Sequence, residues 1–187
     1  MVSPLSWEPC AGVAARDGMA THTRDGCDGT ASGPPMTEGR HTVLLRIVRS
    51  DRNRGFLYVG VVAASDRTAG WPARRTVRSG ATPVAWGFCP LNGHMHATNQ
   101  PSEWGARGRK LLSEDLSGQA VGTRIEMVVD MDARTLSFAI DGRSLIESKV
   151  ELPAAVRPWT LLSHKDDAVL IERYRGPSLV ASPAVAE

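Results

Sequence analysis

Two histidines, His94 and His96, are the residues whose type and spacing best suit a metal ion. Residues two apart in a strand point to the same face, so both imidazoles can meet one ion, with His164 as a candidate third ligand. Zinc takes three or four protein ligands, and each ligating histidine needs a hydrogen-bonded partner. The sequence identifies no further ligands. We therefore predict no metal and no cofactor, and we interpret both histidines as polar residues near the Asn92-Gly93 turn.

A second set of residues, Cys89, His94 and Asp166, has the types found in cysteine nucleophile sites. Cys89 follows directly on the apolar segment Trp86-Gly87-Phe88. A thiol in such surroundings is typically buried and unreactive, because burial disfavours the thiolate. The pattern therefore predicts a packed cysteine.

Two pairs of acidic residues raise the question of glycoside chemistry, which needs two carboxyl groups on either side of the scissile bond. These pairs are Asp130 with Asp132 and Asp166 with Asp167. Aspartates at such positions are typical of turns, and the sequence shows no cleft of sugar-binding aromatic residues. We predict that the protein is not an enzyme.

Charge and hydropathy exclude further classes of function. Acidic and basic residues nearly balance, with 22 Lys plus Arg against 20 Asp plus Glu and a net charge of +2. Nucleic-acid binders usually concentrate basic charge, so we predict no nucleic-acid partner and interpret the arginines of residues 74–78 as a solvated loop. No window approaches the roughly 20 apolar residues of a membrane span. A membrane partner is therefore not expected.

The three cysteines are an odd number without the spacing of metal ligands. Such a set favours reduced thiols over a disulfide framework. The N-terminus lacks the basic start and continuous apolar core of a secretory signal. We predict a soluble intracellular protein, cytoplasmic or nuclear.

The segment 121–145 carries the strongest structural pattern. Apolar residues alternate with polar ones over 124–130 and again over 135–140, which predicts two antiparallel strands joined by a short turn. Asp141-Gly142 then suits a tight hairpin turn, because both central residues of that turn have positive φ. A third strand is expected to begin at Arg143.

Short strands are predicted along most of the chain, because 18 glycines and 12 prolines divide it into short segments. Residues 25–30 and 32–35 are interpreted as loop, and 56–63 as a strand buried on both faces. No segment has the periodicity of an amphipathic helix. The sequence therefore predicts an all-β sandwich of two antiparallel sheets. Other strands are expected at residues 13–15, 19–23, 42–48, 85–88, 95–97, 158–162 and 168–173.

Four blocks of sequence resemble one family. They are Thr37 to His41 with the strand after it, Val59-Gly60-Val61, Ala85 to Phe88 followed by Asn99-Gln100-Pro101, and Val129 to Gly142. In this order and spacing they are similar to the SPRY domain, within it most of all to the SPRY domain of ubiquitin-ligase adaptors that carry a SOCS box. The resemblance covers roughly residues 7–174.

The resemblance implies a bent antiparallel β-sandwich of two sheets, related to concanavalin A-type lectins. It implies a protein–protein interaction module in which rim loops capture a peptide or a protein surface. A link to ubiquitin-ligase machinery follows by analogy only. On this basis residues 1–175 are expected to form a single SPRY domain, with a turn-rich part at 1–40 and a flexible tail at 176–187.

The resemblance also places a candidate site, because adaptors of this group grip an Asn-rich peptide between an early loop, a Tyr and a Trp-Gly pair. The early loop corresponds approximately to residues 24–30, the Tyr position falls on His96, and the Trp-Gly pair falls on His164-Lys165. Aromatic faces supply much of the binding energy at such sites, so we predict the same location with a different specificity. The expected partner-binding residues are Arg24, Asp25, His96, Asn99, His164 and Lys165.

Each of these residues has an expected role. Arg24 would pair with an acidic partner residue, and Asn99 would hydrogen-bond a peptide main chain. His96 and His164 would offer ring faces, which makes binding pH-dependent between about 5 and 7.5.

Two other functions remain open on the sequence. A carbohydrate-binding, lectin-like module would follow from the sandwich alone, and calcium-dependent glycan binding would favour it. A structural subunit of a larger assembly would be favoured by exposed Trp71 or Trp104 without a soluble ligand.

Overall fold

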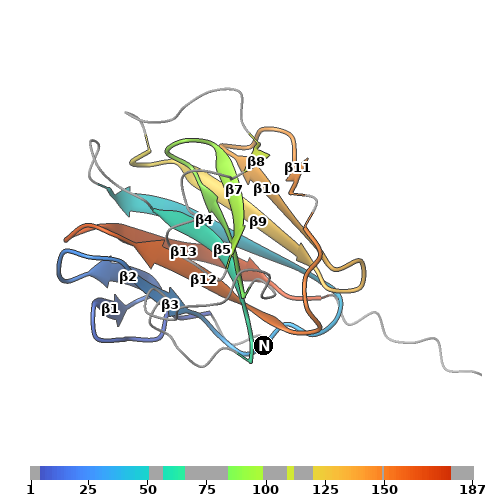
Figure 1. The fold of residues 1–187 in the computed structure, drawn as a ribbon, viewed down its shortest axis with the longest axis horizontal. Helices are drawn as coiled ribbons and strands as arrows, with labels where there is room; N and C mark the ends of the chain where they lie inside the picture. The colour runs from blue at the N-terminus through green and yellow to red at the C-terminus, as the bar shows by residue number, and fades with distance from the viewer. Residues whose placement is uncertain are drawn as a thin grey trace, which may run out of the picture.

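A computed structural model of the chain describes residues 5–50, 57–65, 84–98, 109–111, 120–148 and 150–177. All regular structure in these ranges is β-strand, arranged as two antiparallel sheets packed face to face (Figure 1). The prediction of an all-β sandwich is confirmed. Within the same ranges, no helix is long and apolar enough to cross a membrane.

The larger sheet has seven strands in the order β1-β2-β13-β4-β9-β10-β11. Its strands are β1 (Val13–Arg16), β2 (Met19–His22), β13 (Ala168–Arg175), β4 (Arg40–Arg49), β9 (Arg124–Asp130), β10 (Thr135–Ile140) and β11 (Ile146–Glu147). The smaller sheet has six strands in the order β3-β12-β5-β6-β7-β8. Its strands are β3 (Asp28–Ala31), β12 (Val156–Leu162), β5 (Tyr58–Ala63), β6 (Ala85–Cys89), β7 (His94–Thr98) and β8 (Arg109–Lys110).

The hairpin predicted from alternation is present, with β9 and β10 paired over six residue pairs from Thr135–Asp130 to Ile140–Ile125. Asp141 and Gly142 both have positive φ, 48° and 73°, as the tight turn requires. The expected third strand starts later than predicted. The Arg143 N–H closes the turn on the Ile140 carbonyl at 2.9 Å, so sheet pairing resumes only at Ile146.

Two strands were not predicted, β3 and the two-residue β8. The first of them contradicts a stated expectation. Residues 25–30 look like a loop because they are rich in glycine and aspartate, yet β3 occupies residues 28–31, is buried throughout and pairs with β12. The packing of Gly29 explains why this strand contains a glycine. A Cβ at this position would lie 2.6 Å from Nε1 of Trp159, so only glycine leaves room for the indole ring. Packing against β12 therefore overrides the local preference for a turn.

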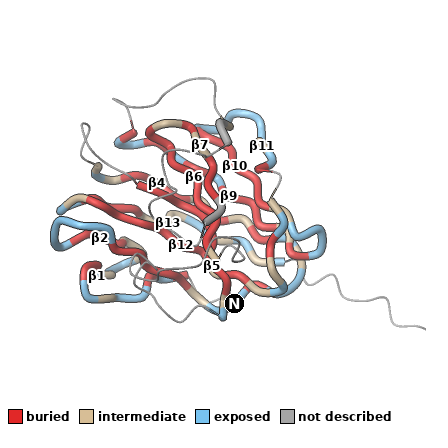
Figure 2. The backbone as a smooth tube through the Cα atoms, in the orientation of Figure 1, coloured by how far each residue is buried: buried red, intermediate tan, exposed pale blue. Residues whose placement is uncertain are grey.

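The core lies between the sheets, where the strands are buried along most of their length (Figure 2). Phe88 of the smaller sheet meets Phe138 of the larger one with ring centroids 5.2 Å apart. Every position of β5 is buried, as predicted. Cys89 is also buried, 1 % exposed, in agreement with its interpretation as a packed thiol.

Candidate interaction site

Two loops cross between the sheets side by side. Residues 23–27 lead from β2 in the larger sheet to β3 in the smaller one, and residues 163–167 lead from β12 back to β13. Because β2 pairs with β13 and β3 pairs with β12, both crossings lie at the same end of the sandwich. We call these two segments the rim loops.

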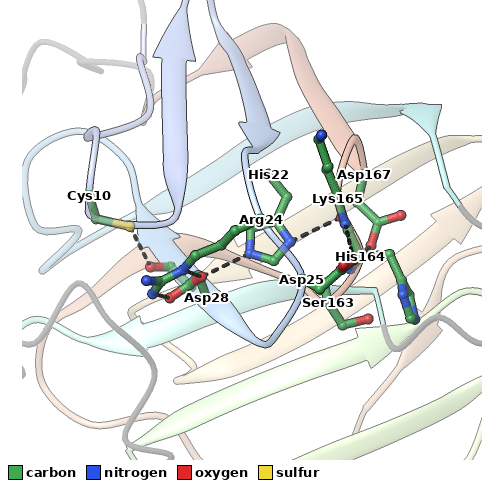
Figure 3. A network of polar contacts seen from close by, with 10 residues as sticks. Cys10, His22, Arg24, Asp25, Asp28, Ser163, His164, Lys165 and Asp167 are labelled. Atoms are coloured by element: carbon green, nitrogen blue, oxygen red, sulfur yellow. Dashed lines mark hydrogen bonds and ion pairs between the residues drawn. The ribbon is translucent and has the colours of Figure 1, made fainter.

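Backbone hydrogen bonds join the rim loops directly. The N–H of His22 donates to the Asp167 carbonyl at 2.9 Å, and the N–H of Asp166 donates back to the His22 carbonyl at 3.0 Å. The Gly26 N–H reaches the Ser163 carbonyl at 3.3 Å. The Lys165 N–H donates to the Asp25 carboxylate at 3.3 Å. The two loops therefore form one surface, and Figure 3 shows the polar contacts that join them.

The carboxylate of Asp28 lies at the base of this surface. The guanidinium of Arg24 binds it with two hydrogen bonds, Nε to Oδ2 at 2.8 Å and Nη2 to Oδ1 at 2.7 Å. Nε2 of His22 lies 2.8 Å from Oδ2. These donors, with Arg24 as the largest cause, lower the pKa of Asp28 to about 2, although burial of the carboxylate opposes them. Asp28 is therefore ionised at neutral pH.

His22 is fully buried and connects Asp28 to the other rim loop. Its Nδ1 lies 3.0 Å from the backbone carbonyl of His164, while its Nε2 faces the Asp28 carboxylate. A carbonyl and an ionised carboxylate only accept hydrogen bonds. His22 therefore connects the Asp28 carboxylate to the backbone of the other rim loop.

Asp167 fixes the shape of the second rim loop. Its buried carboxylate accepts the N–H groups of Ser163 at 3.1 Å and of His164 at 2.9 Å. Asp166 beside it has a φ of 73°, a left-handed conformation that aspartate tolerates better than most residues. A carboxylate that accepts several backbone N–H groups holds a loop in one conformation.

The side chains above this network are open to solvent. Arg24, Asp25 and Lys165 are exposed, and His164 is half-buried. Four of the six residues expected at the site are therefore brought together on the two rim loops. Arg24 is already paired with Asp28, but its side chain is 56 % exposed and its remaining N–H groups are available to a ligand.

His96 is not on this surface. It lies on β7 opposite Gly87, is only 4 % exposed, and packs edge-on against Tyr58 at 5.5 Å between centroids. The expectation that it offers a ring face to a partner is wrong for this structure. Burial, and secondarily the charge of His94, lower the pKa of His96 to about 4. It therefore stays neutral across the range in which a pH-dependent contact was expected.

The remaining expectations concern other parts of the chain. Asn99, Trp71 and Trp104 lie outside the described residues. The imidazoles of His94 and His96 share a face, as their spacing indicates, with centroids 6.1 Å apart. Within the described ranges, no group of three or more His, Cys, Asp or Glu side chains is arranged to hold a metal ion.

Comparison with known proteins finds matches among solved structures but none among family models or curated sequences. No family model and no curated protein sequence matches the chain. Among solved structures, the SPRY domain of human HERC1 aligns with a TM-score of 0.61 and 22% identity, over 85% of this chain and 91% of that one. The TRIM65 PSpry domain aligns with a TM-score of 0.59 and 14% identity, over 91% and 93%.

The chain has the SPRY fold. The resemblance drawn from four short sequence blocks is thereby confirmed at the level of the fold. The similarity to the SOCS-box adaptor group in particular stays a prediction. On this SPRY fold the two segments matched to the adaptor site, residues 24–30 and 164–165, do lie together.

Three residues that organise this end of the SPRY fold were not identified from the sequence: His22, Asp28 and Asp167. The only local signal is an Asp-Gly-rich segment, which favours a turn. Their partners lie up to 142 residues away in the chain, so no local pattern reveals the pairing.

Gly12 is not part of this hydrogen-bond network, but a side chain at its position would displace the Asp28–Arg24 ion pair. A Cβ at Gly12 would lie 1.8 Å from Oδ2 of Asp28 and 2.9 Å from Nε of Arg24. Gly12→Ala should therefore displace the ion pair and lower the free energy of unfolding by about 2 kcal/mol, measured by denaturant unfolding. The same substitution in an Asp28→Ala background should cost much less, because the carboxylate that the methyl group displaces is gone. Equal costs in both backgrounds would contradict this explanation.

Proposed function

We propose that this chain is a protein–protein interaction module that captures a peptide or a protein surface through its rim loops. The observation that carries the proposal is the construction of these loops. A buried network of His22, Asp28 and Asp167 holds the backbone of both loops, while Arg24, Asp25, His164 and Lys165 remain accessible above it. Pre-ordered loops lose little entropy on binding, which favours affinity.

The exposed side chains suggest how a partner is held. Lys165 and Arg24 are cationic and Asp25 is anionic, so the surface suits a partner segment with charges of both signs. His164 supplies a half-buried ring where the adaptors that the sequence resembles carry a tryptophan, so a smaller ligand group is expected there. Asn99 stays a predicted contact.

Cysteine chemistry supports an intracellular location. Cys10, Cys27 and Cys89 are all free thiols. Because unpaired thiols persist in reducing compartments, we place the protein in the cytoplasm or the nucleus. A link to ubiquitin-ligase machinery remains an analogy with the adaptors that the sequence resembles.

A rim variant tests the proposed function. His164→Ala/Lys165→Ala removes two side chains while the loop backbone, which makes the structural hydrogen bonds, is kept. We expect a partner captured from host lysate by the wild type, then purified, to bind the variant at least about tenfold more weakly in calorimetry. Arg16→Ala/Asp17→Asn, in the exposed β1–β2 turn, is the matched control and should bind normally. Equal affinity of all three proteins would move the binding surface away from the rim loops.

A further inference from the structure

The face of the seven-stranded sheet that points away from the core carries an unusual row of side chains. In β4, Val43 and Leu45 point into the core and are fully buried, whereas Thr42 and Leu44 point outward and are partly exposed. The register places Arg173 of β13 and Glu126 of β9 on either side of Leu44. Arg175 lies beside Thr42 in the next row.

Side-chain length makes this face hollow. Long side chains project from the two strands that flank β4: Arg173 and Arg175 from β13, and Glu126 from β9. The shorter side chains of Thr42 and Leu44, on β4 itself, form the floor between them. These five residues line a cavity of about 130 Å³. That space is open to solvent and large enough for several water molecules or for carboxylate groups of a ligand.

A bulge in β13 arranges the charges around the hollow. The register shifts between Ile171 and Arg173, which turns the intervening Glu172 outward. Glu172 is then bound by two arginines, Arg46 at 2.8 Å and Arg124 at 2.8 Å. Its negative charge is therefore already neutralised within the sheet, and this cluster keeps one excess positive charge.

Arg173 and Arg175 differ from these two arginines. Neither forms an ion pair with any residue in the described part of the chain, and both are exposed. Together with Glu126 they give the lining of the hollow a net charge of +1 (two arginines and one glutamate). Residues two apart in a strand are spaced by about 6.6 Å, so the hollow presents two cations at that interval.

We propose that this hollow binds an acidic segment of a protein partner in extended conformation, with two carboxylates spaced two residues apart. An extended peptide repeats its side chains on one face at the same interval of about 6.6 Å, so both carboxylates meet an arginine. The planar guanidinium binds carboxylates with two parallel hydrogen bonds. Leu44 gives the peptide an apolar contact, and Glu126 accepts a backbone N–H or a basic side chain.

Two features favour a peptide over a nucleic acid. Glu126 lies in the hollow itself, where a continuous row of phosphates would meet its negative charge. The net charge of the chain is only +2, without the concentrated basic surface that phosphate backbones require. A segment that alternates acidic and neutral residues can place its carboxylates beside the two arginines and a neutral residue beside Glu126.

Fluorescence anisotropy with three labelled peptides tests the proposal. The probe has four Glu-Thr repeats, the first control has two Glu-Glu-Thr-Thr repeats of equal charge and composition, and the second has four Gln-Thr repeats. Only the first has carboxylates spaced two residues apart. We expect the wild-type protein to bind the probe more tightly than either control, with an affinity that falls as salt is raised.

Protein variants complete the test. Arg173→Gln/Arg175→Gln should weaken binding of the probe by about tenfold, since two exposed ion pairs are lost. Glu126→Gln should strengthen it, because the one anionic lining residue is removed. Arg16→Gln, an exposed arginine on the edge strand β1, should change nothing. Unchanged binding in the double arginine variant, equal binding of the two acidic peptides, or an equal loss in Arg16→Gln would each overturn the proposal.

Discussion

Replacing Asp28 by alanine should lower the free energy of unfolding by about 3–5 kcal/mol, which is the usual cost of removing one partner from a buried charged network. Asp28 is 8 % exposed, and its carboxylate accepts hydrogen bonds from both His22 and Arg24. Without it, the fully buried ring of His22 keeps only the carbonyl of His164 as an acceptor. Denaturant unfolding of the variant beside the wild type measures the loss.

Two further variants test whether the loss in Asp28→Ala comes from the hydrogen-bond network or only from changing a residue of a rim loop. Asp25→Ala, on the same rim loop, removes an exposed carboxylate with one long backbone contact and should cost less than about 1 kcal/mol. In a His22→Ala/Asp28→Ala double variant the loss should be smaller than the sum of the two single losses, because the residues share one interaction. Additive losses would show that Asp28 and His22 contribute independently.

The acid sensitivity of the wild type provides a further signature. The folded-state pKa of Asp28, about 2, lies below its ordinary value of 3.8. A lowered carboxyl pKa stabilises the fold above pH 4, and that contribution is lost as the pH falls toward 2. The loss amounts to about 2 kcal/mol, and we expect it to be absent in Asp28→Ala.

Residues of the β9–β10 hairpin show what the sequence can predict. Alternation over 124–130 and 135–140 sets the face of each side chain, and Asp141-Gly142 sets the turn. These are local properties, so a single segment contains them. The same holds for β5, whose continuous apolar run indicates a strand buried on both faces.

The base of the candidate site shows where such prediction ends. Asp28 belongs to a segment whose local composition favours a turn, and only pairing with β12 makes it a strand. Its contact with His22 closes a short loop, but the contact of His22 with His164 spans 142 residues. Long-range register depends on how the two sheets pack, which local periodicity does not contain.

His96 illustrates a different limit. Its position on a strand was predicted correctly, as was the face that it shares with His94. Whether that face is accessible depends on the rest of the fold, and here the ring is buried beside Tyr58. By contrast, the resemblance to known domains placed Arg24, Asp25, His164 and Lys165 on adjoining loops, and their role in binding stays a prediction.

Burial of His96 leads to the second large effect, a loss of stability in mild acid. Its folded-state pKa of about 4 lies below the ordinary value of 6.5, because burial disfavours the imidazolium. The unfolded chain therefore binds a proton at His96 between these two values while the folded chain does not. Stability is full above pH 6.5 and falls as the pH drops toward 4, by about 3 kcal/mol in all.

Variants at His96 test this directly through the difference in unfolding free energy between pH 7 and pH 4. His96→Phe keeps an aromatic ring against Tyr58 but cannot titrate, so its stability should fall much less over this range than that of the wild type. His164→Gln, which removes a half-buried imidazole from the rim, should keep the full wild-type dependence. The comparison isolates His96 from the other histidines, since His22 and His41 are present in every protein compared.

The two acid effects occupy different pH windows, which makes them separable in one titration. The contribution of His96 is lost from pH 6.5 to 4, and the contribution of Asp28 is lost from pH 4 to 2. If wild type and His96→Phe lost equal stability between pH 6.5 and 4, His96 would be accessible to protons in the folded state. The ring would then be open to solvent on β7, and a place for His96 in partner binding would return.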